Sequence, residues 1–138
     1  MRAFIILLGR MLMSAIFLRG GYGKLMAPTA TMGMLMHYHL PLVQVAYGLA
    51  VAVELLGGAL ILVGWKTRLV APIMAVWCIA TAFVAHWHPD DTAQMINFMK
   101  NLGMAGGFLQ LAAFGPGLLS IDRLTARGGG RPRVAPRA

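Results

Sequence analysis

Residues 42–63, LVQVAYGLAVAVELLGGALILV, form an apolar run that carries a single charge, at Glu54. A helix of about 20 apolar residues is long enough to cross the hydrocarbon core of a bilayer. A short polar break follows at residues 64–68, GWKTR, and a second apolar run begins directly after it, at 69–85. Two spans joined by so brief a connection lie antiparallel. This stretch therefore predicts a transmembrane helical hairpin.

The composition of the whole chain indicates the same environment. Hydrophobic residues make up 59% of it, charged residues only 12%, and the mean hydropathy is +0.72. Soluble domains contain about 25% charged residues. The 138 residues leave room for one domain. Because the membrane spans take up most of that length, a nucleotide-binding fold of alternating strands and helices is excluded.

Two further segments complete the predicted fold class, an all-α membrane protein built as a four-transmembrane-helix bundle. The first span covers about 3–18 and the last about 95–114. Residues 19–24, RGGYGK, place three glycines between two cations, and we expect the first helix to break there, at the membrane interface. A cleaved signal peptide is the competing interpretation of the N-terminal segment. It is disfavoured because no small-residue cleavage site follows the short apolar run.

The rest of the chain is predicted to lie outside the bilayer. Residues 31–37 are expected to form a short interfacial helix, and 118–124 another interfacial piece. The membrane domain then covers 1–124. Residues 125–138 are rich in Gly, Pro and Arg, a composition that cannot form a packed core, and we expect a disordered, basic cytoplasmic tail there. Such a tail would be attracted to the anionic headgroups of membrane lipids.

The distribution of cations predicts the orientation. The formal charge is +8, but the basic residues punctuate apolar segments and form no groove-reading motif, so we expect no nucleic-acid partner. Four spans bring both termini to one side. Arg19 and Lys24 fall on the opposite side, whereas eight cations share the side of the termini: Arg2, Lys66, Arg68, Arg123, Arg127, Arg131, Arg133 and Arg137. The positive-inside rule therefore predicts cytoplasmic termini in a multi-pass protein of the bacterial inner membrane.

Two charges fall near the centres of predicted spans, and they have opposite signs. Arg10 lies in the first span and Glu54 in the second, each ~10 to 15 Å deep by the helical rise. The face around Glu54 carries Ala50, Gly57 and Gly58, which would let another helix approach closely. We therefore predict an ion pair between Arg10 and Glu54. The pair is either a purely structural link or part of a proton relay or ligand cavity, and the sequence leaves both interpretations open.

A candidate ligand-binding group lies at the other end of the bundle. Lys100 and Asn101 stand near the start of the last span, and His86 ends the third span at a similar depth. These polar groups, beside a glycine-lined helix face, suggest a quinone-sized site that opens outward. The competing interpretations are a lysine that snorkels to the interface and histidines that are merely interfacial. His37, His39, His86 and His88 have no metal-ligand spacing, so no metal site is expected. Cys78 is the one cysteine, which excludes a dithiol pair within the chain.

Several short motifs, taken in order, resemble the DoxX family of small bacterial integral membrane proteins. They are Arg10, the segment 20–25 (GGYGKL), the segment 54–58 (ELLGG), GWKTR at 64–68, Lys100-Asn101, Gly106-Gly107 and the segment 115–122 (GPGLLSID). The resemblance covers nearly the whole chain except the arginine-rich tail. It transfers Lys24 and Arg68 as further recurring polar positions without assigned roles, and we add Lys24 to the candidate ligand-binding residues.

The resemblance implies a membrane subunit of a redox system, since relatives are associated with quinone-linked oxidation. On this interpretation the protein binds a quinone or another small lipophilic molecule and docks a partner oxidoreductase, without catalysing a reaction alone; its own catalytic residues stay unknown. A heme is the alternative cofactor, and a homo-oligomer is left open. The competing hypotheses are a small-molecule or ion-handling membrane protein and a structural assembly subunit without catalysis.

Overall fold

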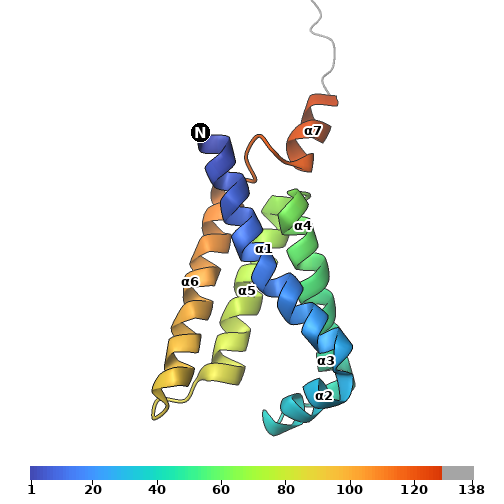
Figure 1. Cartoon of the computed structure of the whole chain (residues 1–138), viewed down its shortest axis with the longest axis vertical. Coiled ribbons are helices and arrows are strands. Elements are labelled where there is room, and N and C mark those ends of the chain that lie inside the picture. Colours follow the sequence, from blue (N-terminus) through green and yellow to red (C-terminus); the bar gives the residue numbers. More distant parts are fainter. Residues whose placement is uncertain (129–138) are drawn as a thin grey trace, which may run out of the picture.

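A computed structural model describes residues 1–128, and these residues form helices joined by short connections (Figure 1). The prediction of an all-α chain is confirmed, since no strand occurs in this part of the chain. The elements are α1 (Arg2–Met26), α2 (Pro28–His37), α3 (Val43–Ala52), the π-helical turn η1 (Val53–Gly57), α4 (Gly58–Val63), α5 (Thr67–His86), α6 (Thr92–Phe114) and α7 (Ile121–Gly128). The elements α3, η1 and α4 follow one another without a break.

Within residues 1–128, three helices are long and apolar enough to cross a membrane. They are α1, the continuous helix Val43–Val63, and α5. Their outer surfaces expose large apolar side chains, such as Phe4, Leu49 and Val76, each more than half exposed. Exposure of this kind is unfavourable in water and favourable in lipid, so the molecule is built with its apolar surface outward.

The helices form two groups, and the contacts of α4 and η1 with α5 join them. The most extensive contact is between α5 and α6, while α1 packs against α3, η1 and α4. Figure 1 shows α1 running obliquely across the bundle, with the N-terminus and α7 at one end and α2 and the α5–α6 connection at the other. The core lies between the groups, where the rings of Phe17 and Phe108 meet with their centroids 5.4 Å apart.

The helices begin and end at residues whose local chemistry favours a helix terminus. Gly64 closes α4 in the left-handed conformation, with φ +70, and Gly115 ends α6 with φ +80. At the start of α6, the Asp91 carboxylate accepts hydrogen bonds from the backbone N–H groups of Ala93 and Gln94 at 2.9 and 3.1 Å. These contacts satisfy donors that a helix leaves unpaired in its first turn.

The first helix does not break at its glycines, contrary to the sequence-based prediction. Instead α1 continues through Gly20, Gly21 and Gly23 to Met26. Leaving backbone groups unpaired in lipid costs more free energy than glycine's weak helix propensity, so the helical hydrogen bonds persist. The glycines provide close packing: a methyl group on Gly20 would come within 2.9 Å of Glu54 Oε2, and one on Gly21 within 2.8 Å of Leu55 Cγ. Lys24 is therefore carried on α1 against η1.

A second boundary also differs from the prediction. The tail expected to be disordered from residue 125 begins with helical residues, because α7 extends to Gly128. Residues 129–138, which include three of the tail arginines, lie outside the described residues.

Candidate functional site

Arg10 is a buried hub at the end of the bundle that carries the N-terminus. It is only 2% exposed, and its guanidinium donates four hydrogen bonds to backbone carbonyls. Nε and Nη2 reach the carbonyl oxygens of Ile61 and Leu62 at 3.0 and 2.6 Å. Nη1 reaches those of Pro116 and Leu119 at 2.7 and 2.8 Å. Arg10 thus joins the C-terminal end of α4 to the segment that follows α6.

Asp122 extends this connection to α5. Its carboxylate accepts hydrogen bonds from the backbone N–H groups of Lys66 and Thr67 at 2.6 and 2.9 Å, which caps the start of α5. The Asp122 backbone N–H donates to the Gly64 carbonyl at 2.9 Å. Gly64 itself packs against the guanidinium, since a methyl group there would lie 2.8 Å from Arg10 Nη1. The end of the bundle is therefore held by contacts between segments far apart in the sequence.

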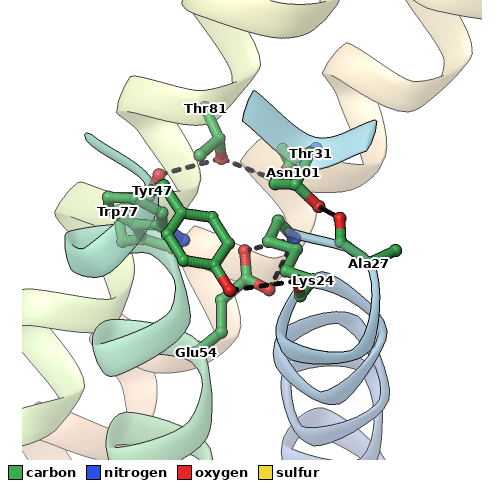
Figure 2. A network of polar contacts seen from close by, with 8 residues as sticks. All are labelled: Lys24, Ala27, Thr31, Tyr47, Glu54, Trp77, Thr81 and Asn101. Atoms are coloured by element: carbon green, nitrogen blue, oxygen red, sulfur yellow. Dashed lines mark hydrogen bonds and ion pairs between the residues drawn. The ribbon is translucent and has the colours of Figure 1, made fainter. Parts of the chain in front are cut away.

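Glu54 of η1 pairs with Lys24 near the C-terminal end of α1, where the Lys24 side chain is 24% exposed (Figure 2). Lys24 Nζ lies 2.9 and 2.7 Å from the two carboxylate oxygens of Glu54, which is 7% exposed. Close by, the Tyr47 hydroxyl donates to the Lys24 carbonyl at 3.4 Å. Glu54 stands in the π-helical turn η1, an irregularity that occurs often at functional sites.

The ion pair predicted between Arg10 and Glu54 is therefore wrong. Arg10 binds four carbonyls, and the salt bridge of Glu54 is with Lys24. The reason is the unbroken first helix. With the helix ending near residue 18, Arg10 is the one cation of that span. With α1 reaching Met26, Lys24 is brought against η1.

The residues predicted to bind a ligand separate into two places. His86, Lys100 and Asn101 line one groove between α1, the end of α5 and α6, whereas Lys24 does not line it. The groove has a volume of about 730 Å³. Its other lining residues are apolar, small or amide-bearing: Met13, Ile16, Asn97, Gly103, Met104 and Gly107. The lining thus combines an apolar wall from α1 with polar groups from α5 and α6.

The polar groups of the groove differ in how many hydrogen bonds they already make to other residues of the chain. His86 Nδ1 lies 2.8 Å from Gln94 Oε1, which orients the ring. The Asn101 amide donates to the Asn97 carbonyl at 3.1 Å. Figure 2 shows its other contact, in which the amide oxygen lies 3.4 Å from the Thr81 hydroxyl. Lys100 is exposed, and no hydrogen bond or ion pair joins its ammonium to residues 1–126. The ammonium is therefore the group most available to a ligand.

Two residues that contact the candidate site residues were not predicted from the sequence. Tyr47 stands seven residues before Glu54, two helical turns away on the same face, so spacing could have indicated it. Thr81 is one of the few polar residues of α5, and its hydroxyl lies 3.4 Å from Asn101 Oδ1 across the helix pair. Its partner lies on another helix, so no local pattern indicates this contact.

The first part of the chain matches a family model. The match is to the DoxX family model and covers residues 5–87, from the first turns of α1 to the end of α5. The chain belongs to the DoxX family. The resemblance noted in the sequence is thereby confirmed. The DoxX match contains Arg10, Lys24, Glu54 and His86, while Lys100 and Asn101 lie beyond it.

Two curated relatives are similar to this DoxX-family chain over almost its full length. Inner membrane protein YphA of Escherichia coli (strain K12) is 34% identical over 127 residues, which are 88% of this chain and 91% of the relative. Inner membrane protein YqjF of the same organism is 37% identical over 119 residues, covering 86% of this chain and 90% of the relative. No solved structure matches the chain. Together with the three apolar helices, these relatives confirm the predicted inner-membrane location.

Proposed function

We propose that this DoxX-family protein is a membrane subunit of a redox system that binds a quinone, or another small lipophilic molecule with a carbonyl head, in the groove beside α6. The observation that supports this is the convergence of His86, Lys100 and Asn101 on one apolar-walled groove. Its volume of about 730 Å³ falls within the ~300 to 1,000 Å³ usual for small-molecule sites.

The lining residues fit a quinone. A quinone presents two carbonyl oxygens, which accept hydrogen bonds, on a flat apolar ring. The Lys100 ammonium is a donor for one oxygen, and a charged donor makes a stronger hydrogen bond than a neutral one. Met13 and Ile16 supply the apolar wall against which the ring packs. When bound, the quinone supplies the electron-carrying chemistry, while these side chains bind and orient it.

A partner oxidoreductase completes the proposal. Residues 1–128 contain no strand and so no dinucleotide-binding fold, and Cys78, the one cysteine of the sequence, is buried. Electrons therefore enter or leave the quinone through a second protein, which this subunit docks in the membrane.

The groove can be tested with two matched glycine variants. Gly103 lines the groove, Gly106 does not, and neither position has an atom within 4 Å of an added methyl group. Gly103→Leu should fill the groove and lower the affinity for decylubiquinone by about tenfold or more, whereas Gly106→Leu should leave it unchanged. Binding is measured by quenching of tryptophan fluorescence in nanodiscs. Lys100→Ala should also weaken binding about tenfold, through loss of a charged hydrogen bond. If Gly103→Leu, Gly106→Leu and Lys100→Ala all bind decylubiquinone with the same affinity, the groove is not its binding site.

A second candidate function, ion or small-molecule handling, is favoured by the Lys24–Glu54 pair, since paired charges inside apolar helices occur along conduction paths. The two candidates give different results in sealed vesicles. Uptake that is lost in Glu54→Gln and kept in Gly103→Leu would favour a path through the pair.

We also propose that α6 is a fourth span and that both termini are cytoplasmic. A helix of 23 residues is ~34 Å long, enough for a bilayer core, and α6 packs along α5. Its polar residues Asn97, Lys100 and Asn101 then face the groove. A cysteine placed at residue 90 should react with an impermeant reagent added from outside the cytoplasm, and one at residue 123 only from within. Reaction of the residue 90 cysteine from the cytoplasmic side alone would reverse this orientation.

A further inference from the structure

A second cleft lies at the end of the bundle that carries Met1 and α7. It has a volume of about 950 Å³ and is bounded by the first turns of α1, the start of α5 and the segment 114–126. Its lining includes four exposed cations: Arg2, Lys66, Arg68 and Arg123. They come from α1, the α4–α5 turn, α5 and α7, so only the fold brings them together.

These cations are not neutralised within the described chain. The salt bridge found in residues 1–126 joins Lys24 and Glu54, and neither residue lines this cleft. One carboxylate, Asp122, does line the cleft, but both its oxygens already accept backbone N–H groups at the start of α5. The cleft therefore presents an excess of positive charge to whatever enters it.

The wall of the same cleft is apolar. Phe114 and Leu69 line it and are 76% and 63% exposed. Both stand on helices that pack against each other in the apolar bundle. A cleft lined by exposed cations and by exposed apolar side chains complements a molecule with an anionic head and a hydrocarbon tail.

The floor of the cleft is held in place from inside the protein. Pro116 lines the cleft, and its carbonyl accepts from Arg10 Nη1 at 2.7 Å. The Ser120 hydroxyl donates to the Gly117 carbonyl at 2.7 Å. Little conformational freedom would therefore be lost in this segment on binding, which favours affinity.

We propose that this cleft is a binding site for an anionic phospholipid, with the headgroup phosphate among the four cations and an acyl chain along Phe114 and Leu69. Cations beside a membrane surface attract anionic lipids, and a guanidinium binds phosphate through two parallel hydrogen bonds. The site is separate from the groove beside α6 and does not depend on quinone binding.

Native mass spectrometry of delipidated protein tests the proposal. Titration with phosphatidylglycerol and phosphatidylcholine should show a preference for the anionic lipid of about tenfold or more. The double variant Arg68→Gln, Arg123→Gln should lose most of this preference. Arg68→Lys, Arg123→Lys should keep most of it, because the charges are retained. Inorganic phosphate at the concentration of the lipid should not displace the lipid, since it lacks the acyl chain.

The matched control is Arg19→Gln, which removes one exposed cation outside the cleft. It is compared with Arg68→Gln alone, which has the same net charge and should lower the preference for the anionic lipid. The Arg19→Gln control should keep the preference of the natural chain. An equal loss in the control, an unchanged preference in the Arg68→Gln, Arg123→Gln variant, or displacement by inorganic phosphate would each overturn the site.

Discussion

Arg10→Gln is expected to lower the free energy of unfolding by about 4 kcal/mol, the estimate for removing several charge-assisted hydrogen bonds from a buried site. The glutamine amide cannot reach four carbonyls on two segments. The carbonyls of Leu62, Pro116 and Leu119 would lose the donor that satisfies them. Thermal or denaturant unfolding in mild detergent, followed by circular dichroism, measures the change.

Two variants bracket this expectation. Arg10→Lys keeps the charge but has three donors on one nitrogen, so it should recover only part of the stability. Arg19→Gln removes an exposed arginine from the same helix and should change stability by less than about 0.5 kcal/mol. If Arg10→Gln is no more destabilising than Arg19→Gln, Arg10 does not hold the end of the bundle together.

Glu54→Gln and Lys24→Gln are each expected to destabilise the protein by ~3 to 5 kcal/mol, the usual cost of leaving one member of a buried ion pair uncompensated. Glu54 is 7% exposed, and both its oxygens bind Lys24. The double variant should be less destabilised than the sum of the single variants, because it leaves no unpaired charge. A double-mutant cycle of unfolding free energies measures this coupling.

A double-mutant cycle of this kind also distinguishes between Lys24 and Arg10 as the partner of Glu54. Glu54→Gln combined with Arg10→Gln should be additive within about 0.5 kcal/mol, since the two residues share no partner. Coupling of Glu54 with Arg10 rather than with Lys24 would contradict the contacts of both residues.

Much of this molecule follows from its sequence alone. The apolar run at 42–63, the break at GWKTR and the low charge content determine a helical hairpin in a membrane. The reason is that backbone N–H and C=O groups in the hydrocarbon core must be hydrogen-bonded within the protein. An apolar helix of this length satisfies all of them within one segment. His86, Lys100 and Asn101 could be placed at one depth by counting residues, and one groove is lined by all three.

What only the tertiary structure decided is which side chain meets which. Glycines that favour a helix end in water remain helical in α1, because unpaired backbone groups in lipid cost more and because Gly20 and Gly21 let η1 approach. That one difference brings Lys24 to Glu54 and leaves Arg10 to bind the carbonyls of Ile61, Leu62, Pro116 and Leu119. A sequence pattern predicts the sign of a buried charge and its depth in the membrane. Its partner is determined by contacts between distant segments, which local periodicity does not encode.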